Sequence, residues 1–212
     1  MFAVGSFEEI VRRERQADTK QVVIFLFVRP TGVLNQDIIK DFEYIHYNSA
    51  GYCSIYAIGY TDDIDHDSSF KAVESVCNNE WYYSNRDYVW FKNKLEERVK
   101  WKYSGEIEIL ILQNNPGSEN SLNFQNYVAI NISKGLRDGY IDSFQAFMES
   151  LIRSTRSKIC PEQVAIDLAN DRIRIKDIIS DAIMDCKKIP TPVKEIIKDR
   201  IFYRSANTFS DH

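Results

Sequence analysis

The chain has few of the residues that build flexible linkers, with eight glycines and five prolines among 212 residues. Disordered chains are usually rich in these residues and poor in apolar ones. Here 44% of the residues are hydrophobic and 27% are charged, as in an ordinary folded protein. The length allows one medium domain with an appendage, or two small domains.

Long apolar runs are also missing. No segment approaches the roughly 20 apolar residues that a membrane-spanning helix needs. The first residues carry Glu8 and Glu9 and lack the basic and apolar regions of a signal peptide. We therefore expect a cytoplasmic protein that makes no contact with a membrane.

The four cysteines, Cys53, Cys77, Cys160 and Cys186, form no CxxC pair and have no zinc-finger spacing. Free thiols in a reducing compartment are the simplest interpretation. Cys53 and Cys186 fall in apolar segments, so we expect both in the core.

Motifs for catalysis are absent as well. The sequence contains no GxSxG, HExxH or dinucleotide-binding glycine pattern, and it has only three histidines. The net charge of −4 argues against a nucleic-acid partner. We therefore nominate no catalytic residue and expect no resident cofactor, except that Ca²⁺ or Mg²⁺ could bind the acidic loop described below.

Three apolar segments, 21–28, 52–60 and 106–112, predict strands buried on both faces. A fourth strand is predicted at 127–132, and it could pair with 106–112 in an antiparallel hairpin. Phe70–Cys77 and Trp81–Tyr83 predict two short strands around an Asn-Asn turn.

Helices are predicted between these strands. Ser6 and Glu9 form a capping box for a helix at 7–16. Apolar residues at helical spacing predict a second helix over 34–45, a third capped by Ser84, and a fourth capped by Asp142 or Ser143.

The order of elements predicts an α/β fold, with a three-layer mixed sheet and helices on both faces. Residues 1–20 are expected to form an N-terminal helix and 21–157 the α/β domain. Residues 158–212 are expected to form a helical C-terminal extension, because the spacing of the isoleucines from 175 to 201 fits amphipathic helices.

Over residues 21–153 this succession resembles the thioredoxin-like fold, in which a β-α-β unit precedes a helix, a β-hairpin and a last helix. That family carries a CxxC motif after its first central strand, where this chain reads Arg29-Pro30-Thr31-Gly32. The family's proline before the hairpin is also missing near Ser104. The resemblance therefore implies a scaffold without redox chemistry.

An acidic loop follows the strand at 52–60. Asp63, Asp65, Asp67, Ser69 and Glu74 occupy positions 1, 3, 5, 7 and 12 of an EF-hand calcium loop. Position 6 lacks the usual glycine, and a strand precedes the loop where an EF-hand has a helix.

Three interpretations of this loop remain open. It could be a solvated connector, or a divalent-cation site formed by Asp63, Asp65, Asp67 and Glu74. It could also belong to a metal-dependent hydrolase or nuclease in which His66 acts as a base.

Basic and aromatic residues alternate along the helix capped by Ser84 and just after it. This pattern is typical of a surface that grips a protein partner. The narrow apolar stripes of the C-terminal extension also need a covering surface. The residues expected to bind a partner are Arg86, Trp90, Lys94, Trp101, Ile179, Ile183 and Ile197.

The interpretation we favour is a non-enzymatic interaction module or subunit of a cytoplasmic, bacterial complex. It would bind another protein or a second copy of itself. The alternative is a metal-dependent hydrolase or nuclease, or a cation-switched binder, that uses the loop at 62–74.

Overall fold

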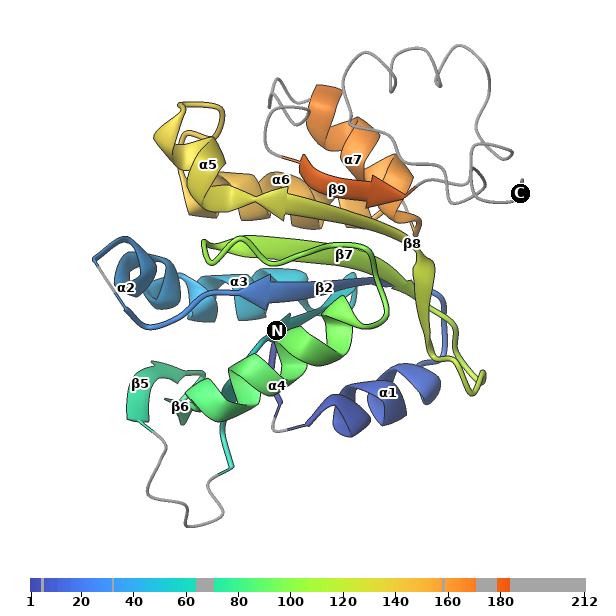
Figure 1. Cartoon of the computed structure of the whole chain (residues 1–212), viewed down its shortest axis with the longest axis horizontal. Helices are drawn as coiled ribbons and strands as arrows, with labels where there is room; N and C mark the ends of the chain where they lie inside the picture. The colour runs from blue at the N-terminus through green and yellow to red at the C-terminus, as the bar shows by residue number, and fades with distance from the viewer. Residues whose placement is uncertain (5, 32, 64–70, 158, 171–178, 184–212) are drawn as a thin grey trace, which may run out of the picture.

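The computed structural model describes residues 1–4, 6–31, 33–63, 71–157, 159–170 and 179–183. The chain has an α/β fold, as expected, with a six-stranded mixed sheet and a second sheet of three strands (Figure 1). None of the described helices has the length and apolar content needed to cross a membrane.

The main sheet has the strand order β1-β3-β2-β7-β8-β9. Strands β1, β3 and β2 are parallel, whereas β7, β8 and β9 each run antiparallel to the strand before them in that order. Ile24 lies opposite both Ile55 and Ile111, so the three strongest predicted strands share one sheet. The strands are β1 (Phe2–Ala3), β2 (Val22–Phe27), β3 (Cys53–Ala57), β7 (Glu108–Asn114), β8 (Leu122–Asn131) and β9 (Ile179–Ile183).

The smaller sheet consists of β4 (Tyr60–Thr61), β6 (Asn79–Tyr83) and β5 (Lys71–Val76), all antiparallel. Cys77 and Asn78, with φ of 54° and 65°, form the two-residue turn between β5 and β6. Such turns need positive φ at both central residues. The predicted strand at 52–60 is divided between the two sheets at Gly59, whose φ is +83°.

Seven helices connect the described strands. The hydroxyls of Ser6, Ser84 and Ser143 accept hydrogen bonds from the first turns of α1, α4 and α6, which confirms the predicted caps. The single helix predicted over 34–45 is two helices that meet at Asp41. The helices are α1 (Phe7–Arg15), α2 (Val33–Lys40), α3 (Phe42–Ser49), α4 (Asn85–Glu96), α5 (Ile132–Arg137), α6 (Phe144–Thr155) and α7 (Pro161–Asn170).

Helices cover the centre of the main sheet. Every residue of β2 is buried, so both faces of this strand are shielded from water. In Figure 1, α4 crosses in front of the sheet with α1 beside it, whereas α3 and α6 lie behind. The rings of Phe7 and Phe91 lie 6.2 Å apart and join α1 to α4, and the ring of Tyr88 contacts Phe27 of β2.

The C-terminal part corrects one prediction. Ile179–Ile183 is a strand, β9, paired antiparallel with β8, whereas the isoleucine spacing predicted a helix there. Isoleucine favours strands as well as apolar helix faces, and the open edge of β8 offers unpaired backbone groups that a strand satisfies. The helix α7 begins at Pro161, as expected for proline in a first turn. The helix predicted at 193–201 lies outside the described residues.

Candidate functional site

Four residues of α4 and the turn after it lie on one helical face, because they are spaced four apart: Arg86, Trp90, Lys94 and Arg98. We call this set the α4 stripe. The side chain of Trp90 is 38% exposed, Arg86 and Arg98 are exposed, and Lys94 is half-buried. The stripe therefore presents an indole and three cations to solvent.

Neighbouring groups hold these side chains in place. The ammonium of Lys94 lies 5.8 Å from the ring centroid of Trp90 and 3.7 Å from a carboxylate oxygen of Glu97. Arg98 donates a 2.9 Å hydrogen bond to the carbonyl oxygen of Lys94. Lys94 therefore makes a cation–π contact with the indole of Trp90, and Arg98 is bonded to the backbone of Lys94.

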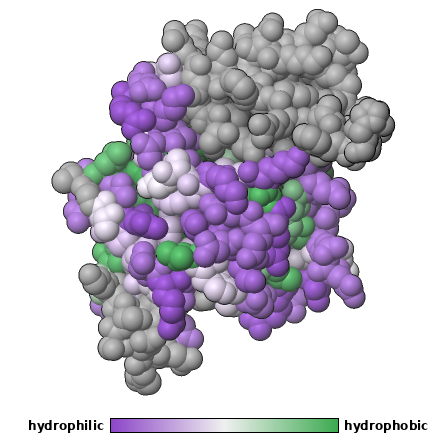
Figure 2. Space-filling view, in the orientation of Figure 1, coloured by the Kyte–Doolittle hydropathy of each residue, from purple (hydrophilic) through white to green (hydrophobic). Residues whose placement is uncertain are grey.

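The α4 stripe ends at a hollow between α1 and the turn after α4, with a volume of about 420 Å³. The guanidinium of Arg98 lies over the ring of Phe7, 4.7 Å from its centroid, and 5.9 Å from that of Phe124. Figure 2 shows small hydrophobic areas among largely hydrophilic side chains on this side of the molecule. The hollow is lined by Phe7, Glu8, Val11, Arg12, Arg15, Gln16 and Arg98.

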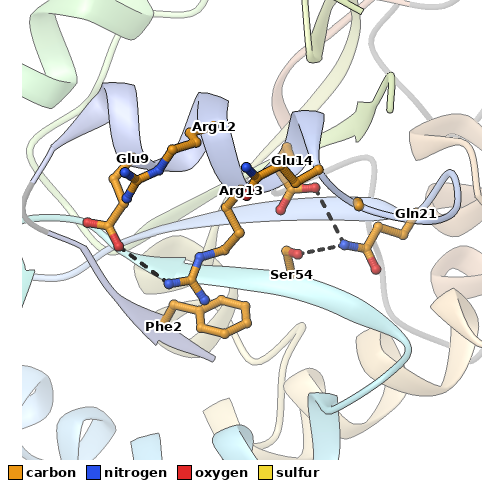
Figure 3. A pocket seen from close by; sticks show the side chains of 9 residues that line it. Phe2, Glu9, Arg12, Arg13, Glu14, Gln21 and Ser54 are labelled. Atoms are coloured by element: carbon orange, nitrogen blue, oxygen red, sulfur yellow. Dashed lines mark hydrogen bonds and ion pairs between the residues drawn. The ribbon is translucent and has the colours of Figure 1, made fainter. Parts of the chain in front are cut away.

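A second hollow, of about 590 Å³, lies on the other side of α1 and shares Arg12 and Gln16 with the first. Figure 3 shows Arg12 and Arg13 projecting from α1, with Glu14, Gln21 and Ser54 grouped farther along the hollow. The guanidinium of Arg13 stacks 4.2 Å from the ring centroid of Phe2 and is 3.4 Å from Glu9. Helix α1 therefore separates two hollows, and Arg12 lines both of them.

Glu14 is fully buried beside this second hollow. One carboxylate oxygen accepts a 2.6 Å hydrogen bond from the phenol of Tyr56, and the other accepts a 2.9 Å bond from the amide of Asn114. The amide of Gln21 lies 3.4 Å from that second oxygen and donates a 2.8 Å bond to Ser54. Burial raises the pKa of the Tyr56 phenol, and the charge of Glu14 raises it further. Every contact of Glu14 ties α1 to the sheet, so its role is structural.

The burial of Glu14 was not predicted from the sequence. Its charge looks like part of a solvated face, yet it follows Phe7 and Ile10 at spacings of three and four. That position on the apolar stripe was the available signal for a buried carboxylate.

The prediction that Trp101 binds a partner is wrong. Trp101 is 1% exposed, its ring lies 4.9 Å from that of Phe27, and its indole N–H donates a 2.9 Å hydrogen bond to Glu108. A buried indole needs such an acceptor, and Glu108 at the start of β7 provides it. Trp101 therefore belongs to the core.

Two carboxylates meet beside Trp101. The amide of Asn131 donates to Glu106 at 2.8 Å and lies 3.4 Å from Glu108. Burial raises the pKa of Glu108, whereas the hydrogen bond from Arg137 lowers the pKa of Glu106. Both carboxylates accept hydrogen bonds from neighbouring protein groups, and Glu108 is fully buried.

Arg29 lies in the turn after β2. Here the guanidinium of Arg29 lies 4.7 Å from the ring centroid of Tyr88. The Nε atom of Arg29 and the hydroxyl of Tyr88 are buried without a hydrogen-bond partner among the described residues. Burial raises the pKa of the adjacent Tyr83 to about 12, and the charge of Arg29 opposes this rise.

Only part of the predicted metal site falls in the described chain. Asp63 is exposed, and the carboxylate of Glu74 in β5 accepts a 3.0 Å hydrogen bond from the backbone N–H of Ser75. Asp65, Asp67 and His66 lie outside the described residues. Within the ranges that the structure describes, no group of three or more His, Cys, Asp or Glu side chains is placed to hold a metal. The loop site remains a prediction.

Ile179 and Ile183, also expected to bind a partner, are not brought to the α4 stripe. Ile179 and Ile183 lie in β9, at the edge of the sheet beyond β8, and Ile197 is outside the described residues. The structure therefore leaves Arg86, Trp90 and Lys94 as the expected partner residues that share one exposed face.

No protein-family model, curated protein or solved structure matches this chain.

Proposed function

We propose that the protein is a non-enzymatic interaction module of a cytoplasmic bacterial complex, and that a protein partner binds the α4 stripe. The observation that carries this proposal is the exposure of Trp90 between Arg86 and Lys94. Tryptophan and arginine are the residues most enriched at the centres of protein interfaces. The free thiols of Cys53 and Cys77 support the cytoplasmic setting.

The scaffold in this proposal is a three-layer, thioredoxin-like arrangement that has lost the redox motif. Its support is the order of elements: the parallel strands β2 and β3 joined through α2 and α3, then α4, the β7–β8 hairpin and α6. The small sheet is an insertion between β3 and α4. Such a scaffold would hold the α4 stripe rigid, because α4 is anchored on β2 through Tyr88.

Site-specific photo-crosslinking in the cells that express the protein tests the proposal. A photoreactive phenylalanine analogue replaces Trp90, and a matched variant carries it at Tyr47, which is 65% exposed on α3. We expect discrete protein adducts from position 90 that are missing from position 47. An adduct of two copies of the chain would identify the partner as a second copy. Finding no adduct at position 90, or the same adducts at both positions, would refute the proposal.

A further inference from the structure

Three arginines converge on the hollow between α1 and α4. Arg12 and Arg15 come from α1 and are one turn apart, and Arg98 comes from the turn after α4. All three are exposed. Helical spacing and the packing of Phe7 against Phe91 thus bring three guanidiniums to one place.

Two of these guanidiniums, those of Arg15 and Arg98, are held by backbone carbonyls. Arg15 donates a 3.0 Å hydrogen bond to the backbone carbonyl of Glu119, and Arg98 donates to the carbonyl of Lys94. Arg98 is further held over the ring of Phe7. In the part of the chain that the structure describes, Arg12, Arg15 and Arg98 form no ion pair with a carboxylate.

The local charge is opposite in sign to that of the whole chain. The lining of this hollow carries three positive charges and one negative charge, from Glu8, whereas the net charge of the chain is −4. Fixed guanidiniums form strong, paired hydrogen bonds with carboxylates. The hollow is therefore complementary to an anionic group.

The hollow also has an apolar component. The half-buried Val11 supplies it, whereas Phe7 is 4% exposed and lies under the guanidinium of Arg98. Trp90 lies farther along the α4 stripe, eight residues before Arg98. A nucleic acid would gain little from the apolar lining, whereas a peptide can place an apolar side chain against it.

We propose that the partner of the α4 stripe presents an acidic peptide segment, whose carboxylates bind Arg12, Arg15 and Arg98 while an apolar side chain contacts Val11. This inference rests on the proposed function and names the chemistry of the partner.

Fluorescence anisotropy with synthetic peptides tests this inference. The probes are a labelled Glu-rich peptide with one Leu, the same peptide with Gln at every Glu position, and a labelled single-stranded oligonucleotide. We expect the Glu-rich peptide to bind at least about tenfold more tightly than either other probe, since its carboxylates form charge-assisted hydrogen bonds. Its affinity should fall as salt is added.

The variant Arg12→Glu should weaken binding of the Glu-rich peptide by about tenfold or more. Arg12 is exposed, so this change should leave the fold intact, which a melting curve checks. The matched control Lys40→Glu makes the same change in net charge on α2 and should leave affinity unchanged.

Equal binding of the Glu and Gln peptides, equal losses in the two variants, or tighter binding of the oligonucleotide would overturn the acidic-segment proposal. If crosslinks still form at position 90 in that case, the interaction module stands and its partner is not acidic. If those crosslinks are also missing, both proposals fail.

Discussion

The phenol of Tyr56 and the carboxylate of Glu14 form a 2.6 Å hydrogen bond that joins β3 to α1. This bond fixes the helix that carries Arg12 and Arg15, because Glu14 lies on its buried stripe. The same carboxylate is bound by Asn114 of β7. One buried acid therefore orients α1, with its Arg12 and Arg15, relative to two strands.

Removing this acid should destabilise the protein. Glu14→Ala removes the acceptor of the Tyr56 hydroxyl and one of the acceptors of the Asn114 amide, at an expected cost of about 2–4 kcal/mol in unfolding free energy. Tyr56→Phe should cost about 1 kcal/mol. Urea denaturation measures both values, with the exposed Glu8→Ala on the same helix as a control expected within about 0.5 kcal/mol. A loss in Glu14→Ala no larger than that of Glu8→Ala would contradict the structural role.

The crossing of the chain from β3 to β4 depends on Gly59. A Cβ atom added there would lie 2.7 Å from the Cβ of Tyr88, and φ is +83°. We expect Gly59→Ala to cost about 2–4 kcal/mol through the clash and the positive φ. Gly51 has φ of +80° and no atom within 4 Å of an added Cβ, so Gly51→Ala should cost only about 1–2 kcal/mol. Equal losses of stability in Gly59→Ala and Gly51→Ala would contradict the close contact between Gly59 and Tyr88 of α4.

Stability should depend on pH through Glu108. Its pKa in the folded protein is raised above 4.5 by burial. The folded state therefore binds more protons than the unfolded state just above pH 4.5, and the contribution of Glu108 to stability falls as pH rises through that window. Glu108→Gln should become more stable relative to the parent protein as pH is raised from about 4 to about 7.

Glu106 provides the matched control. Its folded-state pKa is lowered, chiefly by Arg137, so its stabilisation is present above 4.5 and is lost as pH falls through the folded pKa. Glu106→Gln should therefore become less stable relative to the parent as pH rises. Denaturation curves at both pH values give the two signs, and the same sign for both variants would rule out this assignment.

Thermal melting tests the predicted cation site of the acidic loop. A site that binds only the folded protein raises its melting temperature with ion concentration. If the protein is an interaction module that binds no metal, its melting temperatures in EDTA, Ca²⁺ and Mg²⁺ should agree within about 1 °C. A concentration-dependent rise that is lost in Asp63→Asn would instead establish the cation-binding alternative.

Local patterns in the sequence were enough to predict the cap of α4, its buried stripe and the central strands. Ser84 capped α4 as expected, and the stripe of Tyr88, Phe91 and Leu95 is buried. The continuous apolar runs around Ile24, Ile55 and Ile111 identified the centre of the sheet. The α4 stripe could also be read from the spacing of Arg86, Trp90 and Lys94.

Long-range contacts account for the rest. Trp101 is core rather than surface because Glu108, seven residues later, provides the acceptor for its indole. The segment at 179–183 forms a strand because β8 has an open edge, a fact that no local periodicity contains. The hollow lined by Arg12, Arg15 and Arg98 forms only where α1 and the end of α4 lie side by side. These two helices are separated by almost seventy residues of chain.

The most direct test of binding at the α4 stripe is a titration with the Glu-rich peptide, followed in nitrogen–proton NMR spectra. The signals to observe are the indole N–H signals of the three tryptophans. Trp90 is 38% exposed, whereas Trp81 and Trp101 are 3% and 1% exposed. Binding at the α4 stripe predicts that the Trp90 signal shifts and saturates while the other two stay in place, and that Arg12→Glu suppresses the shift. A Trp90 signal that stays unmoved while the peptide binds would show that the partner surface lies elsewhere.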